Sequence, residues 1–249
     1  MSSDFVCEDH HYTTEIISTD PLLIYINNFI SAREAEAIIA VGLPNLTPSL
    51  LHHSTSLHST PDRARTSLSG ALPPSTPAVS CILGRARSFL GPALLAPTED
   101  FGTPQIVRYA PGGKFDLHYD WYPAPQPLPG GRRGVAFNRV ASFFVYLDGL
   151  ELESESETET EVGLKKGGGD VGGETWFPYI ESGRGREGKG KWRNHEDGGT
   201  AFVPRRGSVV FWVNLHANGT GDERVQHAGL PLRGGVKTAM NIWPRRVYG

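Results

Sequence analysis

A histidine and an aspartate two positions apart offer the first chemistry in this sequence. His118 and Asp120 follow an apolar run and a Pro-Gly-Gly turn at residues 111–113. Alternate side chains of a β-strand lie on the same face, so this imidazole and carboxylate would point the same way. One more histidine from a distant strand would complete the two-histidine, one-carboxylate set that holds non-haem Fe(II) and leaves coordination positions open.

Two downstream histidines could complete the set, His216 and His227. His216 lies in a polar stretch typical of a loop, whereas His227 lies in an extended run. A second His-x-acid triplet, at residues 195–197, is surrounded by glycine, lysine, arginine and asparagine without apolar alternation. No strand would hold that triplet in place, and metal sites require preorganised ligands. We therefore favour His227 as the third ligand.

A lysine near His227 suggests what else the site binds. Lys237 comes ten residues after His227, on the next predicted strand. If residues 225–230 pair with residues 236–242 through the turn at 232–235, Lys237 lines the same pocket. A buried lysine requires an anionic partner, and a dicarboxylate bound to the metal would provide one. Taken singly, His227 could be a hydrogen-bonded core histidine and Lys237 a surface lysine; together with His118 and Asp120 they favour a site.

Composition and patterning indicate a mainly β protein with flanking helices. The chain has 249 residues, 30 of them glycine and 19 proline, and a net charge of −3. So many turn residues suit short strands, and at least eight are predicted, with helices mainly before them. This pattern favours a double-stranded β-helix, the jelly roll of cupin-like proteins. The charge gives no reason to expect nucleic acid or an anionic membrane as a partner.

The predicted organisation is a flexible N-terminus, residues 1–20, followed by a single domain, residues 21–249. Its helical part spans residues 21–100 and its β core residues 101–249. Ser31 and Glu34 have the spacing of a capping box that opens a helix over 32–41, and apolar spacing predicts a second helix over 79–95. A glutamate-rich and glycine-rich stretch at about 150–171 predicts a disordered insertion.

The two cysteines and the N-terminal residues predict a cytoplasmic protein. Cys7 and Cys81 lack CxxC spacing, and free thiols in a reducing compartment are favoured over a disulfide. No secretory signal and no apolar run of about 18 residues is visible. We expect no membrane association and a monomer or weak homo-oligomer.

Several motifs, taken in order, resemble those of the prolyl 4-hydroxylase-type 2-oxoglutarate/Fe(II)-dependent dioxygenases, over about residues 21–245. The matching segments are the strand at 23–29 with its following helix, Arg65-Thr66-Ser67, Arg108-Tyr109-x-Pro-Gly-Gly-x-Phe-x-x-His118-x-Asp120, Arg139, Tyr146-Leu147, Gly172-Gly173-Glu174-Thr175-x-Phe177-Pro178, Gly207-x-x-x-Phe211-Trp212, and His227-Ala-Gly-x-Pro-x-x-x-Gly-x-Lys237 through Asn241-x-Trp243. The interval between Leu147 and Gly172 is longer than this family leads us to expect, which is consistent with an insertion.

The resemblance implies roles for several residues. His118, Asp120 and His227 would bind Fe(II), and Lys237 would bind the far carboxylate of 2-oxoglutarate. The other residues expected at the co-substrate are Tyr109, Tyr146, Thr238 and Trp243, the last packing against the iron pocket. The substrate is expected to meet Arg65, Trp121, Tyr122, Arg139 and Glu174, under the loops at 63–72 and 121–134. Dioxygen would be consumed, with ascorbate as a candidate reductant.

The implied reaction is hydroxylation of a C–H bond with release of succinate and CO2. The substrate would be a prolyl peptide or an amino-acid-type molecule. One alternative is a tailoring oxygenase acting on a small amino-acid-derived metabolite, with desaturation or ring closure as outcomes. Another is a cupin-like module that binds metal without turnover. The chain lacks the secretory signal and extra peptide-binding region of collagen-type enzymes, so collagen modification in a secretory compartment is not expected.

Overall fold

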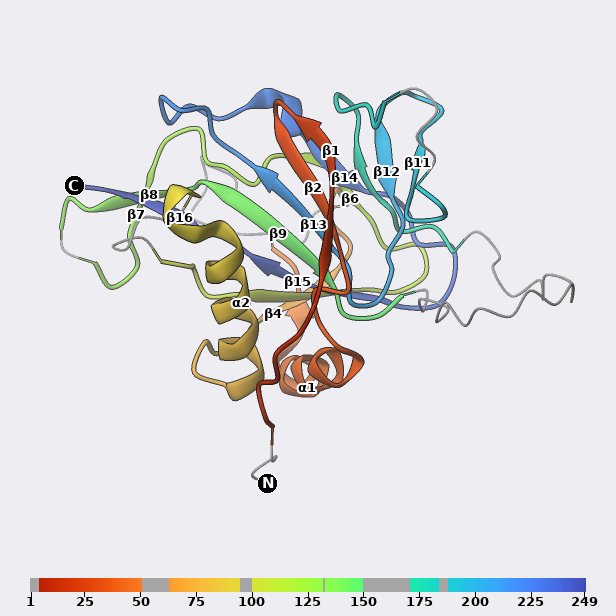
Figure 1. The fold of residues 1–249 in the computed structure, drawn as a ribbon, viewed down its shortest axis with the longest axis horizontal. Helices are drawn as coiled ribbons and strands as arrows, with labels where there is room; N and C mark the ends of the chain where they lie inside the picture. Colours follow the sequence, from red (N-terminus) through yellow and green to blue (C-terminus); the bar gives the residue numbers. More distant parts are fainter. Residues whose placement is uncertain (1–4, 51–62, 95–99, 132, 150–170, 184–187) are drawn as a thin grey trace, which may run out of the picture.

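Two antiparallel sheets form the body of the computed structural model, which describes residues 5–50, 63–94, 100–131, 133–149, 171–183 and 188–249 (Figure 1). The larger sheet contains β1 (Thr13–Thr19), β2 (Leu22–Asn27), β3 (Thr47–Pro48), β4 (Leu68–Ala71), β5 (Gln105–Tyr109), β9 (Ala141–Tyr146), β13 (Val209–Val213) and β15 (Lys237–Ile242). Their spatial order is β1-β2-β13-β9-β15-β5-β4-β3.

The smaller sheet has five strands and faces the larger one. It contains β6 (Phe115–His118), β10 (Thr175–Phe177), β11 (Trp192–Asn194), β12 (Thr200–Phe202) and β14 (His227–Gly229), in the order β11-β12-β10-β14-β6. A third sheet, ordered β16-β8-β7, contains β7 (Gln126–Pro127), β8 (Ala136–Arg139) and β16 (Arg245–Tyr248). The expected mainly β jelly roll with flanking helices is confirmed.

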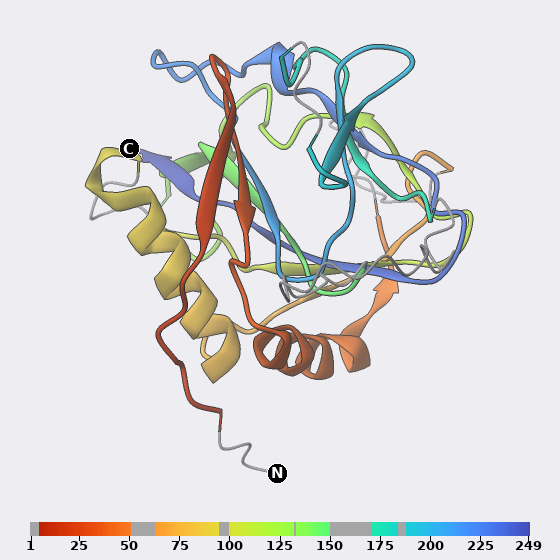
Figure 2. The same ribbon diagram turned by 45° about the vertical axis from the view of Figure 1, so that its right-hand side comes forward.

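Two helices cover the outer face of the larger sheet, α1 (Ala32–Gly42) and α2 (Pro77–Leu94) (Figures 1 and 2). The predicted capping box opens α1: Ser31 Oγ accepts from the Glu34 amide, and Glu34 Oε2 accepts from the Ser31 amide. Two short 3₁₀ turns, η1 (Leu43–Asn45) and η2 (Glu223–Val225), complete the helical elements of the described residues. No helix in the described ranges is long and apolar enough to cross a membrane.

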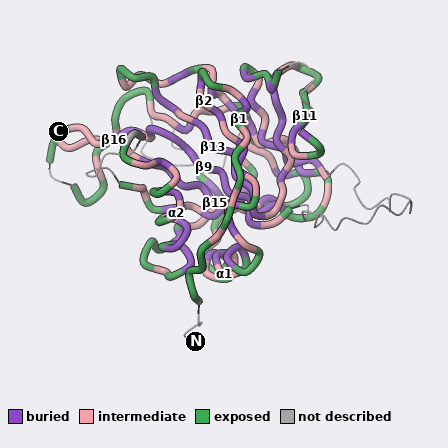
Figure 3. The backbone as a smooth tube through the Cα atoms, viewed as in Figure 1, coloured by how far each residue is buried: buried purple, intermediate pink, exposed green. Residues whose placement is uncertain are grey.

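Alternation along the central strands creates two separate cores. On β15, Met240 and Ile242 pack with the helices, whereas Ala239 packs between the two sheets. On β9, Phe143 and Val145 face the helices in the same way. Every residue of β9 and of β15 is buried (Figure 3). Because side chains alternate in a strand, Lys237 shares the face of Ala239 and lies between the sheets.

The strand pairing predicted around the turn at residues 232–235 is wrong. The strand β14 pairs with β10 and β6 of the smaller sheet, and β15 pairs with β5 and β9 of the larger sheet. The turn therefore carries the chain from one sheet to the other. Residues 225–230 and 236–242 face one another across the core instead of lying side by side.

The N-terminal region also differs from expectation. Residues 13–19, predicted to be part of a flexible segment, form β1 at the edge of the larger sheet, with Thr13 opposite Asn27. The preceding residues bring Cys7 to α2, where it forms a disulfide with Cys81 at a Cα–Cα separation of 5.6 Å. The prediction of free thiols is therefore wrong. Most of the predicted insertion at about 150–171 lies outside the described residues.

Candidate functional site

His118 and His227 are cross-strand neighbours, one on β6 and the other on β14. Their ring centroids are 4.3 Å apart. Each ring is oriented by its Nδ1, which lies 2.8 Å from the Asp116 carbonyl oxygen in His118 and 3.0 Å from the Val225 carbonyl oxygen in His227. Since a carbonyl only accepts hydrogen bonds, Nδ1 carries the proton in both rings, and each Nε2 keeps a lone pair for a metal.

Asp120 follows β6 and completes a cluster with the two histidines. One ligand atom from each residue lies within 4.8 Å of the others. Burial alone would raise the pKa of Asp120, but His227, Arg139 and His118 hold it at about 2. Burial lowers the pKa of both histidines. At neutral pH the cluster therefore offers two neutral imidazoles and one carboxylate, a donor set that suits Fe(II).

Three tethers hold the chain that carries Asp120. Asn138, on β8, donates to the Tyr122 carbonyl and accepts from the Tyr122 amide, both at 2.9 Å. Arg139 donates to the backbone carbonyl of Asp120 at 3.1 Å. The Trp121 indole donates to the Asp222 carbonyl at 3.2 Å. Together these bonds hold the backbone around Asp120 without help from a regular strand.

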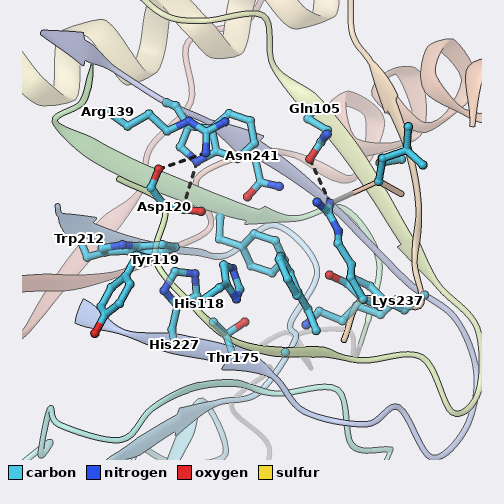
Figure 4. A pocket seen from close by; sticks show the side chains of 18 of the residues that line it. Gln105, His118, Tyr119, Asp120, Arg139, Thr175, Trp212, His227, Lys237 and Asn241 are labelled. Carbon is cyan, nitrogen blue, oxygen red and sulfur yellow. Dashed lines mark hydrogen bonds between the residues drawn. The ribbon is translucent and has the colours of Figure 1, made fainter. Parts of the chain in front are cut away.

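Lys237 lies on the opposite side of the cavity from Asp120, on the larger sheet (Figure 4). Only 3% of Lys237 is exposed, and its Nζ donates to the Gly173 carbonyl. The rings of Tyr109, Phe144 and Tyr146 surround Nζ at 5.1 to 5.6 Å. No carboxylate of the described residues lies within ion-pair distance of it, so this buried cation suits an incoming carboxylate.

The environment also weakens the charge of Lys237. Burial lowers its pKa to about 7, against the opposing influence of the carboxylates of Glu174 and Asp148. A ligand carboxylate at Nζ would favour the protonated form.

A cavity of about 450 Å³ joins the cluster to Lys237. Of the predicted residues, those lining it are His118, Asp120, His227, Lys237, Tyr109, Arg65, Tyr122, Arg139 and Trp243. Lining residues that the sequence reasoning missed include Gln105, Phe144, Thr175, Trp212 and Asn241 (Figure 4). Gln105 could have been found from strand alternation, because residues 105, 107 and 109 lie on the same face of β5 and Tyr109 was already predicted to be in the site. In the same way, Asn241 lies four residues after Lys237 on β15 and therefore shares its face.

Four predicted residues lie outside the cavity lining. Thr238 follows Lys237 and therefore projects from the other face of β15. Tyr146 is fully buried behind the residues that line the cavity, and its hydroxyl donates to Thr175 Oγ1 at 2.8 Å. Trp121 turns toward Asp222, as described above. Glu174 accepts two bonds from Arg193, in a neighbouring cavity of about 590 Å³ that Lys237 also lines.

The rejected histidines lie elsewhere. His195 packs on the Trp176 ring, and its two acidic neighbours are exposed, although the three side chains could also approach one ion. His216 is 45% exposed and faces Asp222 at 3.7 Å. Neither histidine lines the cavity.

A jelly roll with two histidines, a carboxylate and a facing buried lysine defines a class of metal-dependent oxygenase. Residues 104–245 match the model of the 2OG-Fe(II) oxygenase superfamily, and the chain belongs to this family. It is a 2-oxoglutarate-dependent dioxygenase that uses Fe(II), 2-oxoglutarate and O2. The His118, Asp120 and His227 cluster could bind the iron.

Curated relatives carry the prolyl 4-hydroxylase name. The chain is 27% identical over 240 residues to prolyl 4-hydroxylase 13 of Arabidopsis thaliana, covering 92% of this chain and 73% of that protein. It is 26% identical over 224 residues to prolyl 4-hydroxylase subunit alpha-1 of Rattus norvegicus, covering 90% of this chain and 34% of the subunit. The chain thus spans about a third of the animal subunit.

Solved structures share the fold. The viral collagen prolyl hydroxylase of Paramecium Bursaria Chlorella virus-1, in its 2OG complex, is similar with a TM-score of 0.59 and 21% identity, covering 90% of this chain and 95% of that chain. A Pseudomonas putida prolyl-4-hydroxylase is similar with a TM-score of 0.51 and 17% identity, covering 95% and 93%.

Proposed function

We propose that this dioxygenase hydroxylates a prolyl residue in a peptide, with release of succinate and CO2. In this proposal His118, Asp120 and His227 hold Fe(II), and Lys237 holds the far carboxylate of 2-oxoglutarate. The observation that carries it is one cavity with two neutral imidazoles and an ionised carboxylate on one side, and on the other a buried lysine with no carboxylate of the described residues within ion-pair distance. The prolyl 4-hydroxylase names of the relatives support the choice of substrate.

The residues of the chain bind, orient and shield in this reaction. Lys237 and Tyr109 are cross-strand neighbours on β15 and β5, so they share a face and together hold the co-substrate. Fe(II) supplies the dioxygen chemistry that couples decarboxylation of 2-oxoglutarate to oxygen insertion into a C–H bond.

The substrate enters beside Arg139 and Tyr122 in this proposal. The Arg139 guanidinium lies 3.7 Å from the Trp243 ring centroid and 4.9 Å from that of Tyr122. Stacking fixes its plane, and its remaining N–H groups are suited to a peptide carbonyl. Arg65, whose guanidinium donates to Ser67 and Gln105, would contact the substrate from the other wall.

Succinate formation tests the proposal. Purified protein is incubated with Fe(II) and 2-oxoglutarate, with a proline-rich peptide, free proline or no addition. We expect stimulation by the peptide, abolished by His227→Ala and retained in His216→Ala and His195→Ala. Stimulation by free proline but not by the peptide would instead favour a small-molecule oxygenase, and metal binding without any succinate would favour a non-catalytic module. Loss of metal in His216→Ala would contradict the proposed ligand set.

The cytoplasmic location and the monomeric or weakly oligomeric state stay predictions. The disulfide between Cys7 and Cys81 opposes a reducing compartment, where thiols are kept reduced. Alkylation of the protein in freshly lysed cells distinguishes the two cases. Alkylation of both cysteines before any reduction would support a cytoplasmic location. Alkylation of neither cysteine before reduction would support a location in an oxidising compartment.

A further inference from the structure

The two oxygens of the Asp120 carboxylate have different surroundings. Oδ2 accepts two hydrogen bonds, from the Ser142 hydroxyl at 2.7 Å and from the Trp243 indole at 3.0 Å. Oδ1 accepts none from the residues that the structure describes. The lone pairs of one oxygen are thus engaged by the protein, and those of the other are left for a metal.

A buried asparagine determines where the Ser142 proton points. Asn214 Nδ2 donates to Ser142 Oγ at 2.9 Å. Because this N–H can only donate, the single proton of Ser142 is directed away from Asn214 and toward Asp120. Asn214 and Ser142 are fully buried, so no bulk water competes for these bonds.

The orientation of the Asn214 amide has an energetic reason. Asn214 Oδ1 is buried without a hydrogen-bond partner. Turning the amide over would give Oδ1 the Ser142 proton, but Asp120 would then lose a donor and Nδ2 would be unpaired. Hydrogen bonds to an ionised acceptor are about twice as strong as neutral ones. The chain of bonds that ends on the carboxylate is therefore favoured.

We propose that Ser142 and Asn214 are positioning residues that hold Asp120 so that it offers the metal one oxygen only. This inference rests on the proposed role of Asp120 as an Fe(II) ligand. An aspartate free to turn could offer both oxygens and take up a coordination position. That position is one that the co-substrate or dioxygen requires. The two residues thus protect access to the metal more than they contribute to its affinity.

The test uses Co(II) as a spectroscopic probe in place of iron. Co(II) is titrated into the metal-free protein, followed by 2-oxoglutarate, and visible absorption reports both steps. In Ser142→Ala we expect Co(II) affinity within about threefold of wild type, although groups that orient metal ligands typically contribute about 10- to 100-fold to metal affinity or activity. Here we expect a loss of that size in 2-oxoglutarate affinity instead, because the released carboxylate would compete for the position that the co-substrate needs. Ser142→Thr keeps the hydroxyl and should restore co-substrate affinity.

Two further variants separate positioning from folding. Asn214→Asp keeps the serine but offers its proton a competing acceptor, so it should weaken 2-oxoglutarate binding as Ser142→Ala does. Ser208→Ala removes another buried serine hydroxyl, which bonds to the Arg205 carbonyl away from the cavity, and should change neither affinity.

The outcomes separate this inference from the proposed function. Equal losses of Co(II) and 2-oxoglutarate affinity in Ser142→Ala, or no loss of either, would overturn the positioning role while leaving the ligand set intact. Retention of full Co(II) affinity by His227→Ala would instead overturn the ligand set itself.

Discussion

Replacing Lys237 by methionine tests the co-substrate site most directly. Methionine keeps an unbranched apolar stem among the rings of Tyr109, Phe144 and Tyr146, and removes the charge together with the donor to the Gly173 carbonyl. A hydrogen bond to a charged group contributes about 1.5 to 3 kcal/mol. At about 1.4 kcal/mol for each factor of ten, the apparent KM for 2-oxoglutarate should rise about 10- to 150-fold.

The assay measures succinate against 2-oxoglutarate concentration at saturating Fe(II). Lys191→Met is the matched control, because Lys191 bonds to Glu15 at 2.6 Å, is only partly buried and lines neither cavity. Its KM should not change. Removing a buried charge that lacks a carboxylate partner should leave the free energy of unfolding of Lys237→Met unchanged or raise it. An unchanged KM in Lys237→Met, with metal binding intact, would refute the proposed anchor.

Three further outcomes are expected. His227→Ala should lose Co(II) binding in a spectroscopic titration, while His216→Ala keeps it; the reverse result would show that the wrong third ligand was chosen. The pKa of Lys237 is about 7 in the free protein, so above that pH binding must take up a proton. Calorimetry should then show 2-oxoglutarate affinity falling, by up to about tenfold per pH unit, and a flat profile from pH 7 to 9 would contradict it. Arg85→Met should leave Glu34 buried without its 2.7 Å ion pair and lower the urea-derived free energy of unfolding by about 3 to 5 kcal/mol; a loss below 1 kcal/mol would mean that the pair contributes little.

Local patterns predicted the parts of the site whose residues are close neighbours in the sequence, although Asp120 lies two residues beyond the end of β6 and not within it. The spacing of His118 and Asp120 predicted a shared direction, and the structure brings both side chains together with His227. The capping box at Ser31 and Glu34 predicted where α1 begins, because every atom involved lies within four consecutive residues. Such features depend on geometry that neighbouring residues fix.

Features that depend on distant segments could not be predicted in this way. Alternation indicates which residues share a face but not which sheet a strand joins, and this is why β14 and β15 were wrongly paired. The disulfide depends on the N-terminal residues reaching α2, which spacing between Cys7 and Cys81 does not reveal. Ser142 and Asn214 were missed because they carry no recognisable chemistry until Asp120 is placed beside them.

The corrected pairing explains the site better than the predicted one. Adjacent strands in one sheet would have set His227 and Lys237 side by side, with both side chains close to the metal. In the structure the histidines belong to the smaller sheet and Lys237 to the larger. Facing sheets pack about 10 Å apart, so a molecule that reaches both groups must span the core. A dicarboxylate with a metal-binding group at one end and a free carboxylate at the other meets that requirement. A monocarboxylate with the same metal-binding end would leave Lys237 buried without a carboxylate partner.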